Sequence, residues 1–225
     1  MAFFLSLFPV VQSEAFSQTT LKLSQTNGSD STAKPSAAYR YRFENDKFTT
    51  PVLELDFDAT GKGKFRFIKK DSEEIVNDLA VSEMLLLKIR SLFDQLNFLA
   101  SQEDYQHKKD FSHLGTVTIS QARNGKERTV KFNYTDHPAM NQLRDIFQNI
   151  TSQETRFFEI EVVRETDPIS TPAQMRLLED DLRSKRIADP NRFVPLLKSL
   201  LLDESVPLIA RNHADRILKT IAKGK

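Results

Sequence analysis

Alternating aromatic and charged residues predict β-strands in the first part of the folded chain. At residues 39–44 (YRYRFE) every second residue is aromatic and its neighbours are charged. The alternation recurs at residues 53–58 (LELDFD) and, after the turn signal DATG, at residues 64–69 (KFRFIK). A period of two is typical of a strand with one buried face. These segments therefore predict an antiparallel meander whose outer face pairs charges of opposite sign across the strands.

The period then changes to that of an amphipathic helix. Within residues 82–100, leucines and one isoleucine recur at steps of three and four, which places them on one face of a helix. Two alternating runs follow at residues 115–122 and 126–134, separated by Asn124-Gly125, which is a strong hairpin signal. Residues 138–150 again show a helical stripe. This part of the chain therefore predicts a helix, a β-hairpin and a second helix.

Residues 151–166 allow two interpretations. Thr151 and Glu154 fit the capping box of a helix. In contrast, Phe158, Ile160 and Val162 alternate with glutamates as they would in a strand. The helix is the slightly favoured interpretation.

Three helix signals follow in the C-terminal part. Thr171-Pro172 starts a helix that should run to about Lys185, and Asp189-Pro190 starts another that carries five apolar residues. A third helix follows the turn at residues 203–205. Strands grouped ahead of helices, without regular βαβ alternation, predict an α+β fold: an antiparallel sheet of about five strands with packing helices, followed by an all-helical C-terminal region. We assign residues 39–168 to the α+β domain and residues 169–225 to the helical region.

The N-terminus has the pattern of an export signal. Residues 2–11 (AFFLSLFPVV) form an apolar run of signal-peptide length, and Ala15-Phe16-Ser17 offers small residues for cleavage after position 17. No Lys or Arg precedes the run, which departs from the usual signal. The alternative is a core strand or membrane-surface segment of a cytosolic protein. We expect a signal peptide at residues 1–17, a disordered polar linker at 18–38, and a periplasmic or secreted protein with no transmembrane span after signal removal.

Composition excludes several classes of chemistry. The 225 residues include no cysteine, which rules out disulfides, thiol nucleophiles, and iron–sulfur or zinc sites built from cysteine. Thirty-two Lys and Arg residues against 31 Asp and Glu give a net charge of +1, so a nucleic-acid partner is not expected. The chain has neither a G-x-S-x-G nucleophile elbow nor the spacing of a phosphate-binding loop. We expect no cofactor.

Three residues form a candidate metal site. His107, Asp110 and His113 follow one another at steps of three, and two imidazoles with one carboxylate could hold zinc with an open position. Against this, steps of three stay on one helical face for only about one turn, and Lys108 and Lys109 bring positive charge to the same segment. The hypothesis is testable because the three side chains must then converge in a pocket.

The last two helices resemble a known repeat. Residues 190–222 contain an apolar helix (FVPLLKSLL), an Asp-containing turn and a second helix (LIARNHADRILKTI). They resemble a single HEAT-type repeat, without the neighbouring copies that such solenoids need. The chain as a whole is similar to a group of uncharacterised exported bacterial proteins, a resemblance that implies export and no activity.

Two hypotheses for function follow. The first is an exported, non-enzymatic binding or interaction protein of unknown ligand, which contacts a protein partner through its C-terminal helices. Residues 172–225 carry eleven basic against seven acidic residues, which fits an acidic partner but equally fits solvated helix faces. The alternative is a metal-dependent or other hydrolase with a site near His107, Asp110 and His113. The sequence leaves the oligomeric state open.

Overall fold

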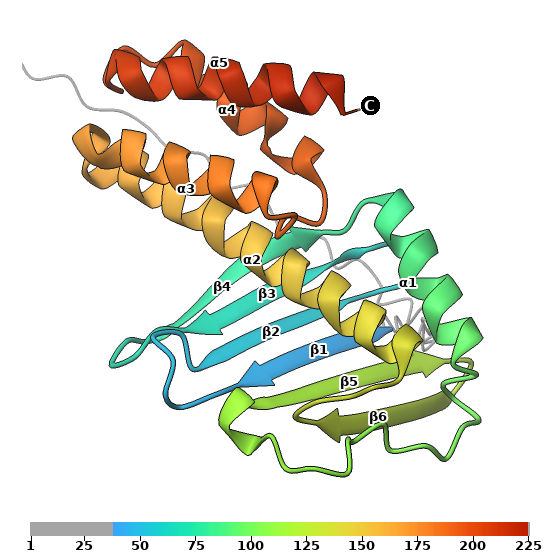
Figure 1. Cartoon of the computed structure of the whole chain (residues 1–225). Helices are drawn as coiled ribbons and strands as arrows, with labels where there is room; N and C mark the ends of the chain where they lie inside the picture. Colours follow the sequence, from blue (N-terminus) through green and yellow to red (C-terminus); the bar gives the residue numbers. More distant parts are fainter. Residues whose placement is uncertain (1–37, 225) are drawn as a thin grey trace, which may run out of the picture. The chain divides into compact units, whose positions relative to one another are not determined.

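The computed structural model describes residues 38–224, and the predictions for the signal peptide and for linker residues 18–37 lie outside the described residues. Six antiparallel strands form one sheet in the order β4-β3-β2-β1-β5-β6 (Figure 1). Their bounds are β1 Tyr39–Glu44, β2 Val52–Phe57, β3 Lys62–Ile68, β4 Glu74–Ala80, β5 Thr116–Arg123 and β6 Lys126–Phe132. The C-terminal part is helical, so the predicted α+β fold is confirmed.

Strand β4 is the element that the sequence pattern missed. Its sequence, EIVNDLA, has Asn77 in the register of the inward-facing residues, whereas Val76 is 47% exposed. Because β4 lies at the edge of the sheet, only Leu79 of this strand is buried. Because an edge strand alternates only weakly, the sequence pattern predicts about five strands, whereas the sheet has six.

Two helices cover one face of the sheet (Figure 1). Helix α1 spans Glu83–Gln95, and helix α2 spans Pro138–Thr166 and runs diagonally across the strands. The inward-facing strand residues pack with the apolar faces of these helices into one core. The side chains of this core that are at most 1% exposed include Leu55, Phe57, Phe65, Phe67, Ile89, Phe93, Ile119, Leu143, Phe147 and Ile150. Burial of these large aliphatic and aromatic side chains is the main force that holds the sheet and the two helices together.

The opposite face of the sheet carries paired charges, as predicted. The register sets Arg42 opposite Glu54 and Glu54 opposite Arg66. Arg42 donates to Glu54 at 2.7 Å, and Arg66 donates to the same carboxylate at 3.3 Å. A second row runs through Arg40, Asp56, Lys64 and Asp78, where Arg66 also reaches Asp56 and Lys64 donates to Asp78 at 2.6 Å. Opposite charges thus alternate from strand to strand across this face.

Residues 151–166 are helical, which confirms the slightly favoured interpretation. They form the second half of α2, a continuous helix of 29 residues. Phe158 packs against Phe67 of the sheet at 5.2 Å between ring centroids, whereas Ile160 belongs to a separate core among the C-terminal helices. The alternation that resembled a strand therefore consists of one residue that packs on the sheet, one that lies in the second core and one, Val162, that is exposed.

The C-terminal helices build that second core. They comprise α3 Thr171–Arg183, α4 Val194–Leu201 and α5 Leu208–Lys223, with short 3-10 turns at Pro168–Ser170 and Pro190–Phe193. Met175, Leu178, Phe193, Leu197 and Leu200 are fully buried among them, together with Ala210, Ala214 and Ile217 of α5. Since Ile160 of α2 joins this core and Ile150 joins the sheet core, one helix links the two.

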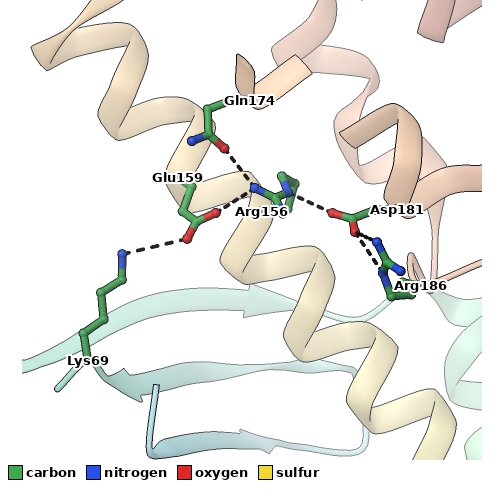
Figure 2. Close-up of polar contacts among 6 residues, drawn as sticks. All are labelled: Lys69, Arg156, Glu159, Gln174, Asp181 and Arg186. Carbon is green, nitrogen blue, oxygen red and sulfur yellow. Dashed lines mark hydrogen bonds and ion pairs between the residues drawn. The ribbon is translucent and has the colours of Figure 1, made fainter. Parts of the chain in front are cut away.

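An ionic network fixes α3 against α2 (Figure 2). Arg156 of α2 donates to Asp181 of α3 at 2.8 Å and to Gln174 at 2.9 Å. Arg156 also donates to the carboxylate of Glu159. A carboxylate oxygen of Glu159 lies 3.9 Å from Nζ of Lys69, which follows β3. Asp181 also accepts two hydrogen bonds from Arg186. The Arg156 and Asp181 side chains are only 16% and 9% exposed, so this pair is largely desolvated.

Two further arginine–carboxylate pairs repeat the arrangement along α2. Arg192 lies against Glu154, which is 3% exposed, and stacks its guanidinium over Phe157 at 3.9 Å. Arg164 donates to Asp203, in the turn after α4, at 2.6 Å. Helix α3, the 3-10 turn at Pro190–Phe193 and the turn after α4 are thus each tied to α2 by one guanidinium. None of the helices between residues 38 and 224 combines the length and the apolar character needed to cross a membrane.

Replacing Asp181 tests how much the ionic network contributes to the free energy of unfolding. Asp181→Ala removes the carboxylate shared by Arg156 and Arg186 and leaves the largely buried Arg156 guanidinium with Glu159 as its remaining carboxylate partner, so we expect a loss of about 2 kcal/mol in the free energy of unfolding, measured by urea titration. The matched control is Asp180→Ala, which breaks only the exposed pair with Arg183 and should cost less than about 1 kcal/mol. Equal losses in the two variants would contradict this assignment.

Candidate functional site

The candidate metal residues lie in the loop between α1 and β5, and each has its own local partner. His107 is held by its backbone N–H, which donates to the Tyr134 carbonyl at 2.9 Å. Asp110 accepts hydrogen bonds from the backbone and hydroxyl of Ser112, and His113 lies exposed on the 3-10 turn Ser112–Leu114. No group of three metal-ligating side chains occurs between residues 38 and 224. The structure thus does not bring His107, Asp110 and His113 together as a ligand set.

His107 instead shares a pocket with a second histidine. The pocket has a volume of about 380 Å³ and is lined by residues 103–108 and 135–137. In it, the Nε2 atom of His107 lies 2.9 Å from a carboxylate oxygen of Asp136. The Nε2 atom of His137 lies 4.0 Å from a carboxylate oxygen of Glu103. We call these four side chains the histidine pocket.

The second nitrogen of each imidazole is occupied by the backbone. Nδ1 of His107 accepts from the Lys109 N–H at 2.9 Å, and Nδ1 of His137 accepts from the Met140 N–H at 3.4 Å, where it caps the start of α2. His137 is thus the N-terminal cap of α2. An acceptor at Nδ1 requires the neutral ring to carry its proton on Nε2, the atom that points toward a carboxylate. Both rings are thus set to donate a hydrogen bond at the pocket.

The wall of the histidine pocket is rigid. Tyr105 is 4% exposed and adopts a φ of +62°, a left-handed conformation that bulky residues rarely occupy. Its ring meets His137 edge-on at 5.3 Å and stacks on Phe98 at 6.4 Å. The guanidinium of Arg128 lies over both aromatic rings and donates to the carbonyls of Phe98 and Glu103. These contacts hold the loop in its strained conformation.

The side chains of this pocket offer hydrogen-bond donors on the imidazoles and acceptors on the carboxylates. None of the hydrogen bonds made by residues 38–224 joins a serine or threonine hydroxyl to either imidazole. The sequence pattern does not reveal Glu103 and Asp136 as partners, because roughly thirty residues separate each carboxylate from its histidine along the chain. Only the folding of the β5–β6 hairpin beside the loop brings them to one place.

A second candidate lies at one end of the C-terminal helices. Five aliphatic side chains are exposed there: Val162 (37%), Ile169 (81%), Leu202 (85%), Leu208 (62%) and Ile209 (60%). They belong to the last turns of α2, the turn before α3, the turn after α4 and the first turn of α5, which meet on the same side in Figure 1. Arg164 joins two of these segments, because it donates to Asp203 at 2.6 Å and to Ser199 at 2.7 Å.

The same segments are acidic. Residues 161–170 and 202–209 contain five acidic residues and a single basic one, Arg164, which is already paired with Asp203. Loss of hydration, with repulsion from Glu165 among the smaller contributions, raises the pKa of the Glu161 carboxyl. Hydrogen bonds from Ser205 and Arg164 lower the pKa of Asp203, so this carboxylate is held in its charged form. We call residues 161–170 and 202–209 together the acidic apolar end.

The two candidates differ in the kind of ligand they fit. The histidine pocket is small and presents hydrogen-bond donors beside carboxylates, whereas the acidic apolar end is a surface of exposed aliphatic side chains among carboxylates. Comparison with known proteins finds no matching family model and no matching curated protein.

The geometry of the histidine pocket predicts the tautomers of its imidazoles. At a pH where both rings are neutral, His107 and His137 should carry their protons on Nε2, because Nδ1 accepts a backbone N–H in each. Long-range ¹H–¹⁵N correlation spectra distinguish the two tautomers directly. Asp136→Asn should change the Nε2 signal of His107 and leave that of His137 in place. A protonated Nδ1 on His107 would show that the Lys109 contact is absent in solution.

Proposed function

We propose that this chain is a non-enzymatic binding protein that docks a protein partner on the acidic apolar end of its C-terminal helices. The observation that carries the proposal is the exposure of Ile169, Leu202, Leu208 and Ile209, each at least 60% exposed, within one end of the helical region. Scattered single apolar residues are normal on a protein surface, but aliphatic side chains gathered in one place are typical of an interaction site.

The distribution of charge supports the same conclusion. The last turns of α2 carry Glu161 and Glu165, although the negative end of a helix dipole disfavours carboxylates. The stability of α2 therefore does not account for them. A partner that brings lysine or arginine side chains would gain favourable contacts with these carboxylates, which also raise the rate of encounter.

The surface is held in position by partly buried contacts. Arg164 and Asp203, 27% and 19% exposed, pair across the junction between α2 and the turn after α4. Thr171 and Val206, which are buried, anchor the turns that carry Ile169 and Leu208. Preorganised side chains lose little conformational entropy on binding, so such a surface favours association.

These features define the chemistry of the partner. It should present apolar side chains flanked by basic ones, as a cationic amphipathic helix does. Export through residues 1–17 remains part of the proposal and would place the partner in the periplasm or the medium.

Replacing the exposed aliphatic side chains tests the proposal. The probe is a synthetic amphipathic helix of leucine and lysine, and its affinity is measured by fluorescence anisotropy. We expect the variant L202S/L208S/I209S to bind at least tenfold more weakly than the unaltered chain, because it loses the apolar contact area. Rising salt should weaken binding to the unaltered chain, because the carboxylates are solvent-exposed.

The matched control is Leu87→Ser on α1, which replaces a leucine of similar exposure, 57%, far from the acidic apolar end in sequence. It should bind the probe as the unaltered chain does. Equal affinities for the triple variant and the unaltered chain would overturn the proposal, and so would the lack of saturable binding by the unaltered chain.

A further inference from the structure

The opposite end of the C-terminal helices has the opposite charge. Residues 179–187 and 215–224 contain six basic residues, Arg183, Lys185, Arg186, Arg216, Lys219 and Lys223, against the four acidic residues Glu179, Asp180, Asp181 and Asp215. These segments are the C-terminal ends of α3 and α5 with the residues that follow α3, and residues of both line one groove. Together they form what we call the basic end.

The basic end contains a groove. It lies between α3 and α5, has a volume of about 390 Å³ and is lined by Glu179, Leu182, Arg183, Arg216, Ile217 and Thr220. The half-buried Leu182 supplies apolar surface beside the buried Ile217, and the side chains of Arg183 and Arg216, 77% and 62% exposed, lie at the rim. The groove thus combines a small apolar surface with two exposed arginine side chains, one of which pairs with Glu179 in the same lining, and two exposed guanidinium groups are a feature that the acidic apolar end lacks.

The existing partners of these arginines do not block an incoming carboxylate. Arg183 pairs with Asp180, and both side chains are more than half exposed. Arg216 pairs with Glu179 at 3.0 Å and lies 2.8 Å from Nδ1 of His213. Exposed ion pairs contribute little free energy, so these guanidinium groups can accept a second carboxylate at small cost.

Helix dipoles explain only part of this segregation of charge. Basic residues at the C-terminal ends of α3 and α5 are favoured by the dipole. The acidic residues at the C-terminal end of α2 are not, as described above. The segregation therefore points to complementarity between two surfaces.

The two surfaces of one molecule face away from each other. Helix α5 begins at the acidic apolar end with Leu208 and ends at the basic end with Lys223, and its sixteen residues span about 24 Å. One molecule consequently cannot join its own two ends. A second copy of the chain can supply the missing partner.

Building on the proposed function, we propose that the partner is another copy of this chain: the acidic apolar end of one molecule docks into the groove at the basic end of the next. Leu208 and Ile209 would supply apolar side chains that contact Leu182 and the neighbouring lining of the groove. Carboxylates such as Glu204 would pair with Arg183 and Arg216. The two surfaces differ, so the contact is heterologous, and repetition of it produces either a closed ring or an open filament.

A heterologous contact predicts a distinctive result when two one-sided variants are mixed. The full-length variant L202S/L208S/I209S keeps only its basic end, and the variant R183E/R216E keeps only its acidic apolar end. Each variant alone should remain monomeric in light scattering coupled to size-exclusion chromatography. Their equimolar mixture should form dimers and nothing larger, because each pair leaves only impaired surfaces free.

The unaltered full-length chain should show a mass that rises with protein concentration and falls with added salt. Each variant should weaken self-association at least tenfold, and the control Leu87→Ser should not change it. If R183E/R216E does not fold, the single variant R183E alters only an exposed side chain and serves in its place.

The outcomes separate this inference from the proposed function. An unaltered chain that stays monomeric at all concentrations overturns self-association, and the proposed function survives if the cationic helix still binds. Self-association that the mixture of variants does not restore would show a symmetric contact and would overturn the head-to-tail arrangement. Failure of both the self-association and the peptide binding would overturn both proposals.

Discussion

Helix α2 must bury apolar side chains on two sides, and the rest of the structure depends on this requirement. Its first half packs Leu143, Phe147 and Ile150 into the sheet core, and Ile160 lies in the core formed by α3, α4 and α5. A helix of 29 residues is rigid over about 44 Å, so it fixes where the second core begins relative to the sheet. The C-terminal helices thus take their position from α2.

The arginine–carboxylate pairs along α2 provide specificity for that packing. Arg156 with Asp181, Arg192 with Glu154, and Arg164 with Asp203 join α2 to three successive C-terminal segments. A desolvated ion pair adds little net stability compared with an apolar pair of equal volume, because both charges lose hydration. A wrong alignment of the helices, however, would leave a charge desolvated and unpaired, which is costly. These pairs therefore select one alignment of α3, α4 and α5, and this alignment brings the turns of the acidic apolar end together.

The two candidate sites illustrate different ways in which a fold creates a surface. The histidine pocket is made by a strained loop that Arg128 and the ring of Phe98 hold against the β5–β6 hairpin. The two ends of the C-terminal helices arise because α3 and α5 run in the same direction. Their N-terminal ends therefore lie at one end of the helical region and their C-terminal ends at the other. Charge that is spread through the sequence becomes segregated in space by this arrangement.

Local periodicity determined most of the secondary structure. The alternation of aromatic and charged residues specified β1, β2 and β3, and it also specified the charge rows, because residues of opposite sign had to meet in an antiparallel register. Asn124-Gly125 specified the β5–β6 hairpin, and helical stripes specified α1 and the first part of α2. The start signal Thr171-Pro172 specified α3, and Asp189-Pro190 preceded the 3-10 turn that leads into α4. These features depend on neighbours a few residues apart, which a sequence pattern records directly.

Long-range packing decided the remainder. Strand β4 lies at the edge of the sheet, and an edge position leaves only a weak alternation in the sequence. The apolar pattern of residues 151–166 depends on a helix that lies between two cores, which no local pattern records. His107 has Asp136 beside it, rather than Asp110 and His113, because the hairpin and not the spacing determines its neighbours. The sequence likewise shows only that Leu202 and Ile209 are apolar. That they face solvent beside carboxylates follows from which helix faces are already occupied by the second core.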